Sequence, residues 1–198
     1  MTPSSRRSPL VRFLLKAIAS LLLLMVAWSF VSKWTSYPVA FTTHWALDVV
    51  ADDWVQSIHQ QVGVIEVQTR LTMRYGGKEA DIVVEADPAR YAYSLPIFLA
   101  LLLAASGSGD ALRRGKLAAL GYFILLPCQT FSLSMDLLKQ MAVAMPGGAR
   151  ALGIAQWQLE GIALGYQLGS LVVPTLIPIV LWVWLDKAYV TSLTKPND

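Results

Sequence analysis

One uncharged stretch near the C-terminus limits the folds that this chain can adopt. No charged residue occurs in residues 161–185, and Asp186 and Lys187 follow directly. At a rise of ~1.5 Å per residue, a helix of this length crosses a ~30 Å hydrocarbon core with some tilt. The stretch therefore predicts a transmembrane helix, and the rest of the chain has to be compatible with a membrane.

The same stretch carries two internal signals. Gly161, Gly165 and Gly169 recur every fourth residue and predict a helix face without side chains, which lets another helix come close. That helix belongs either to this chain or to a partner protein, and the spacing is compatible with both. Pro174 and Pro178 each remove an intrahelical hydrogen bond and predict a kinked second half.

The composition agrees with a membrane protein. Hydrophobic residues make up 55% of the chain and charged residues make up 15%. Soluble domains carry roughly 25% charged residues. The net charge of +3 does not indicate nucleic-acid binding, because the basic residues cluster beside apolar segments. Cys128 is the single cysteine, which rules out an intramolecular disulfide and a multi-cysteine metal site. We predict neither a metal nor a cofactor.

Three further apolar segments are predicted to span the membrane. Residues 1–35 read as a basic tail and an uncleaved helix, because the apolar run is longer than that of a signal peptide, roughly 7–15 residues. Bulky residues also stand where cleavage would need small ones. Residues 91–109 and 117–135 are the second and third spans, joined by a basic loop at 110–116. Tyr93 is expected at an interface, and Pro127 is expected to kink the third span.

Residues 36–90 are predicted to form a small polar insertion. An apolar stripe at helical spacing predicts an amphipathic helix over residues 45–60, placed either on the membrane or on a sheet. Alternating residues over 65–74, a turn at 75–78 and a strand over 79–86 predict a β-hairpin. The predicted fold class is thus a mainly α membrane protein, with four transmembrane helices and an extracytoplasmic helix-plus-hairpin insertion.

The charges of the loops predict one topology. Basic residues are in excess before the first span and at 110–116, whereas the insertion is acidic and the connection 136–160 is near neutral. By the positive-inside rule, the N-terminus and the tail 186–198 face the cytoplasm. The insertion and the 136–160 connection then share the outer side.

Few residues are candidates for catalysis or for metal binding. Cys128 would need a base within hydrogen-bond reach to act as a peptidase nucleophile, but His44 and His59 lie in the outer insertion. His44 and Asp48 stand one helical turn apart, and His59 is too distant on the same helix to complete a metal site. We therefore interpret these polar residues as a solvated helix face, and we predict no catalytic residue.

Polar residues near the span ends are candidates for contacts with a partner protein. Asp136 and Lys139 close the third span, where they either contact a partner, pair with each other or reach the headgroups. Tyr93, Tyr166 and Gln167 are the other candidates, because aromatic and polar side chains at this level need partners.

Three strings together resemble the exosortase H-associated membrane proteins of Gram-negative bacteria. They are Asp87-Pro88 followed by Tyr91-Ala92-Tyr93-Ser94-Leu95-Pro96, then Met135-Asp136-Leu137-Leu138-Lys139-Gln140, and Ala163-Leu164-Gly165-Tyr166-Gln167-Leu168-Gly169 with Pro174 and Pro178. The resemblance implies an inner-membrane accessory protein beside exosortase H, an enzyme that processes proteins carrying a C-terminal sorting signal. The family has no assigned catalytic residues, so the resemblance identifies none in this sequence.

Two hypotheses follow for the function. In the first, the chain is a non-enzymatic accessory or scaffold protein that binds an exosortase-like enzyme, its substrates and membrane lipids. In the second, it is a small transporter or permease subunit, which requires homo-oligomers because four helices alone do not enclose a pore. An intramembrane peptidase is a weaker third possibility.

Overall fold

The computed structural model describes residues 9–75, 78–105, 111–144 and 147–194. Within them the helices are α1 (Pro9–Thr35), α2 (Tyr37–Val50), α3 (Ala89–Ala92), α4 (Ser94–Ala104), α5 (Ala111–Val143), α6 (Gly148–Ala151), α7 (Gln156–Gln167), the π-helix η1 (Leu168–Val172), α8 (Val173–Leu185) and α9 (Lys187–Thr194). The strands are β1 (Val55–Gln61), β2 (Val64–Tyr75) and β3 (Lys78–Ala86). The predicted turn at 75–78 lies partly outside the described residues.

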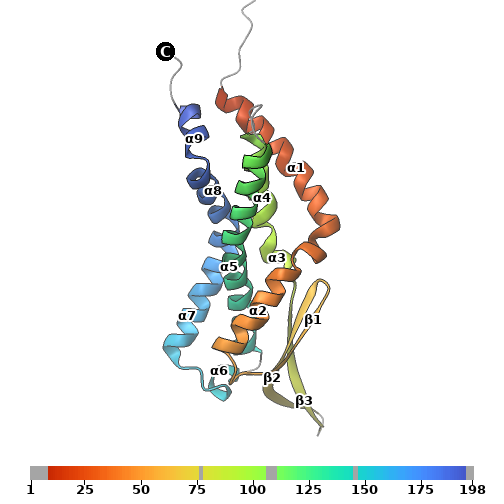
Figure 1. The fold of residues 1–198 in the computed structure, drawn as a ribbon. Coiled ribbons are helices and arrows are strands. Elements are labelled where there is room, and N and C mark those ends of the chain that lie inside the picture. Colours follow the sequence, from red (N-terminus) through yellow and green to blue (C-terminus); the bar gives the residue numbers. More distant parts are fainter. Residues whose placement is uncertain (1–8, 76–77, 106–110, 145–146, 195–198) are drawn as a thin grey trace, which may run out of the picture.

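The molecule is an elongated helical bundle with a small sheet at one end (Figure 1). The start of α1 and the helix α9 lie together at the end opposite the sheet and α6. Helix α4 contacts α1, α5 and α8, while α5 also contacts α2, α7 and η1. Buried apolar side chains form two cores, one beside the sheet and one near α9.

Among the described residues, three helical stretches are long and apolar enough to cross a membrane: Pro9–Thr35, Ala111–Val143 and Gln156–Leu185. The predicted second span, 91–109, is not among them. Its described part belongs to a shorter apolar stretch, Ala89–Ala104, formed by α3 and α4. At ~1.5 Å per residue this stretch is ~24 Å long, short of a ~30 Å hydrocarbon core. Of the four predicted spans, the structure therefore supports three.

The helix α5 is longer than its predicted span. Residues 117–135 lie inside one 33-residue helix that continues through Pro127. Its length of ~50 Å exceeds the hydrocarbon core by several turns. The basic residues predicted in the 110–116 loop, Arg113, Arg114 and Lys116, stand instead in its first turns. The predicted loop was wrong because Arg and Lys are good helix formers.

The insertion contains three strands in the order β1-β2-β3, all antiparallel. The predicted helix over 45–60 was therefore wrong in its second half. Helix α2 ends at Val50, and residues 55–61 pair with β2, with Ile58 opposite Val67. A two-stranded hairpin is marginal in water, and a third strand contributes the missing cross-strand contacts. That tertiary pairing overrides the helical spacing of the local sequence.

The predicted alternation in the second strand is confirmed. Ile65, Val67, Thr69 and Leu71 are buried, whereas the intervening positions are partly or fully exposed. Helix α2 packs along α5 through its buried residues, which include Val39 and Leu47. Helix α2 thus covers α5 and also contacts β1, and its placement on the membrane surface stays a prediction.

The last membrane stretch begins earlier than predicted, at Gln156 instead of 161. Its π-helical turn η1 ends directly before α8, and Pro174 stands at the first positions of α8. A proline ring has no N–H and clashes with the preceding turn, and a wider π-turn accommodates both defects. The Thr175 hydroxyl donates to the carbonyl of Leu171 at 2.5 Å. Beyond Leu185, part of the predicted tail 186–198 forms the helix α9.

Candidate functional site

A polar pocket lies where the sheet meets the helices. Its volume is about 480 Å³, and we call it the junction pocket. Four elements contribute to it: the end of β3, α3, α5 and α7. The lining residues are Glu85, Ala86, Asp87, Arg90, Asp136, Lys139, Gln140 and Tyr166.

Asp136 forms the buried wall of the junction pocket and is 6% exposed. The Gln140 side-chain amide donates to its carboxylate at 3.1 Å. The buried phenol of Tyr91 is hydrogen-bonded to the same carboxylate. Both donors are neutral, so they solvate the carboxylate with dipoles and not with an opposite charge.

The two cations of the junction pocket lie on different elements. Lys139 Nζ lies 3.7 Å from the centroid of the Tyr166 ring. This is a cation–π contact between α5 and α7. A pairing of Asp136 with Lys139 was one predicted arrangement, but the contacts found for these residues lead to other partners. Arg90 is exposed on α3 and brings the second positive charge.

The charges of the junction pocket are mixed. Three carboxylates, of Glu85, Asp87 and Asp136, face two cations, of Arg90 and Lys139, which leaves one negative charge in excess. The Asp87 carboxylate also accepts from the backbone N–H of Ala89 at 2.8 Å. This local bond fixes the turn into α3. A ligand that brings a cation would complement this net charge.

The sequence-predicted contact residues divide into two groups. Asp136, Lys139 and Tyr166 come together in the junction pocket, whereas Tyr93 caps α3 and Gln167 is exposed at the end of α7. Glu85, Arg90 and Gln140 were not among the predicted contact residues, and Asp87 was not predicted to line a pocket. The Asp87-Pro88 pair predicted the end of a strand, but it did not predict that residues 85–90 line a pocket.

The predicted glycine series meets different surroundings at its three positions. A methyl group on Gly169 would lie 2.9 Å from the Cα of Ser132, and one on Gly165 would lie 2.6 Å from the sulfur of Met135. Both neighbours belong to α5 of the same chain. A methyl group on Gly161 would meet nothing within 4 Å. A role of the series in binding a partner helix stays a prediction, and only Gly161 is open to one.

The residues considered for catalysis lie on separate elements. Cys128 is on α5, where its thiol contacts the carbonyl oxygen of Ile124 at 3.5 Å. His44 stands on α2 and lies 3.4 Å from Asp48, and His59 stands on β1, not on the predicted helix. Among the described residues, no three His, Cys, Asp or Glu side chains are grouped to hold a metal ion.

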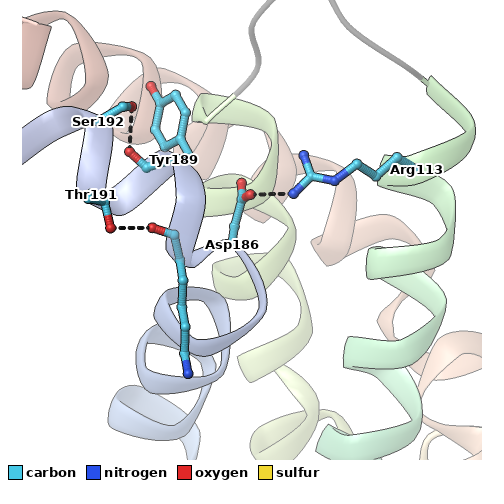
Figure 2. A network of polar contacts seen from close by, with 6 residues as sticks. Arg113, Asp186, Tyr189, Thr191 and Ser192 are labelled. Atoms are coloured by element: carbon cyan, nitrogen blue, oxygen red, sulfur yellow. Dashed lines mark hydrogen bonds and ion pairs between the residues drawn. The ribbon is translucent and has the colours of Figure 1, made fainter.

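A second polar cluster lies at the other end of the bundle (Figure 2). Arg113 of α5 donates to the Asp186 carboxylate at 2.8 Å, and this carboxylate side chain is 6% exposed. The backbone carbonyl of Asp186 accepts from the N–H groups of Tyr189 and Val190, which starts α9. The ion pair therefore ties α5 to the junction of α8 and α9.

These observations define the class of protein. Apolar helices long enough to span a bilayer, with a small sheet at one end, are the features of a membrane protein. Sequence comparison then identifies the family: the pattern of the exosortase H-associated membrane proteins matches residues 7–189. The chain belongs to this family, as the resemblance implied. Comparisons with curated proteins and with solved structures give no match.

Proposed function

We propose that the chain is a non-enzymatic accessory subunit of an exosortase-type protein-sorting system in the bacterial inner membrane. The family name associates its members with exosortase H, and this association is the starting point. The observation that carries the proposal is the junction pocket, which combines charged and hydrogen-bonding groups without a nucleophile paired to a base among its lining residues. Such a pocket is suited to holding a polypeptide.

The pocket lies beside the sheet, at the end of the long helices. In the proposed arrangement this end faces the periplasm, and a polar loop of the enzyme or its substrate enters the junction pocket. The helix α1 supports a further contact, because Phe13 is its one buried residue and its other faces are open to lipid or to partner helices. Helix docking through α1, or through the open position Gly161, would align the partner with the pocket.

Co-purification tests the proposal directly. The tagged full-length chain, extracted from native membranes in a mild detergent, is expected to retain exosortase H, as identified by mass spectrometry. An equally expressed inner-membrane protein with the same tag is the control. A chain that purifies free of the enzyme under conditions that preserve other membrane complexes would contradict the accessory role. No contact in the described part of the chain specifically favours the transporter hypothesis.

The proposed orientation leads to a separate prediction. In a Cys128→Ser background, Thr72→Cys on the sheet is expected to react with an impermeant maleimide in intact spheroplasts. Lys187→Cys at the other end is expected to react only after the membrane is permeabilised. Both positions are exposed, so access to reagent is set by the membrane. Equal labelling of the two positions in intact spheroplasts would overturn the topology.

A further inference from the structure

A second pocket, at the end of the bundle opposite the sheet, suggests a ligand of a different kind. It has a volume of about 260 Å³ and lies between α1 and α9. We call it the terminal pocket. Its lining residues are Pro9, Arg12, Phe13, Lys16, Tyr189, Ser192 and Leu193. We propose that the terminal pocket binds the phosphate headgroup of an anionic phospholipid.

The position of the terminal pocket matches the headgroup layer. The helix α1 has 27 residues. It therefore extends over ~40 Å, which is more than a ~30 Å hydrocarbon core. Arg12 and Lys16 lie in its first two turns, and α9 starts just beyond the membrane stretch that ends at Leu185. The start of α1 and α9 are at the same end of the molecule (Figure 1). Both walls of the pocket thus reach the level of lipid phosphates.

The charge of the terminal pocket is positive. Arg12 and Lys16 are separated by one helical turn and project from the same face of α1. None of the lining residues is acidic. The Asp186 carboxylate, at the junction of α8 and α9, is paired with Arg113, which offsets part of its negative charge (Figure 2). An anion is thus the ligand that the pocket attracts.

Tyr189 adds a neutral donor to the two cations. Burial, and then the nearby Asp186 carboxylate, raise the pKa of Tyr189, so its phenol keeps its proton at neutral pH. The Ser192 hydroxyl already donates to the carbonyl of Tyr189 at 2.6 Å. The lining groups that we assign to a bound phosphate are therefore Lys16 and Tyr189, while Arg12 adds positive charge to the same wall.

Aromatic contacts hold the two walls of the terminal pocket together. Phe13 stacks on Trp182 of α8 with a centroid distance of 5.2 Å and an interplanar angle of 11°. The Phe13 ring also lies 5.9 Å from the ring of Tyr189. The site is preorganised, with apolar atoms of Phe13 and Leu193 beside the polar groups. Its volume is below the ~300–1,000 Å³ of pockets for drug-sized ligands, so it takes a headgroup while the acyl chains remain in the bilayer.

Native mass spectrometry of the detergent-purified full-length chain tests this proposal. Phosphatidylglycerol is expected to be retained in preference to phosphatidylcholine with the same acyl chains. Lys16→Gln is expected to weaken phosphatidylglycerol binding about fivefold, the effect of one basic side chain near an anionic lipid surface. Tyr189→Phe is expected to weaken it by a smaller factor. Lys187→Gln, an exposed position at the same end and outside the pocket, is the matched control.

The possible outcomes separate the proposal from its rivals. Equal retention of the two lipids, or equal losses in Lys16→Gln and Lys187→Gln, would overturn it, because either result indicates general surface charge. Inorganic phosphate that displaces the lipid at millimolar concentration would show that the pocket recognises free phosphate and not a lipid. Circular dichroism establishes that each variant is folded. The result does not depend on co-purification with exosortase H, so the two proposals can fail separately.

Discussion

Gly121→Ala is expected to destabilise the helical bundle by about 1–3 kcal/mol, the typical cost of overpacking a well-packed core. A methyl group at Gly121 of α5 would lie 2.1 Å from Cε1 of Phe98, a separation that requires a shift. Phe98 is fully buried on α4, so its ring has no free space to enter. Thermal unfolding of the detergent-solubilised protein, followed by its intrinsic fluorescence, should show a lower Tm.

Gly115 provides the matched control on the same helix. A methyl group at Gly115 would meet nothing within 4 Å. Because alanine is favoured over glycine in a helix by about 1 kcal/mol, Gly115→Ala should leave the Tm unchanged or raise it. Adding Phe98→Leu to Gly121→Ala should recover part of the lost stability, as expected for two residues in direct contact. Equal Tm shifts for the two glycine variants would contradict this packing.

The contrast between glycines shows what spacing alone predicts. A period of four places Gly161, Gly165 and Gly169 on one helix face, but only the neighbouring helix decides which of them are in contact. In the structure α5 reaches Gly165 and Gly169 and does not reach Gly161. Gly121 had no such periodic signal, and its close approach to Phe98 follows from how α4 and α5 pack.

The secondary structure was predictable where one pattern dominated. The apolar stretches of α1, α5 and α8, and the alternation in β2, are strong local signals. The residues of β1 carried a weak helical spacing, and their pairing with β2 is a contact between segments that local sequence does not encode.

The junction pocket was predictable only in part. Asp136 and Lys139 were predicted as contact residues because ionisable groups near the membrane are costly to bury and often have a function. Glu85 and Arg90 lie much earlier in the sequence, before α4, and the fold brings them to the same pocket. The ion pair of Arg113 and Asp186, 73 residues apart, is non-local in the same way.

Removing two carboxylates from the junction pocket is expected to abolish retention of exosortase H. Glu85→Gln combined with Asp136→Asn changes the charge of the pocket from −1 to +1 while conserving side-chain shape. Disrupting charged groups at the centre of an interface typically costs about 2–5 kcal/mol, which corresponds to roughly 30-fold or greater weakening. The measurement is the amount of enzyme that co-purifies with the tagged chain.

The design of this test separates binding from folding. The amide introduced by Asp136→Asn retains a carbonyl oxygen that accepts from Gln140, so this substitution should preserve the contacts within the helix bundle. Asp48→Asn with Asp52→Asn removes two exposed carboxylates from the same end of the molecule and should leave co-purification intact. If both double variants retain the enzyme equally at unchanged Tm, the junction pocket is not the contact site. Loss confined to the pocket variant would make its negative charge the determinant of partner binding, with a cationic segment as the group it receives.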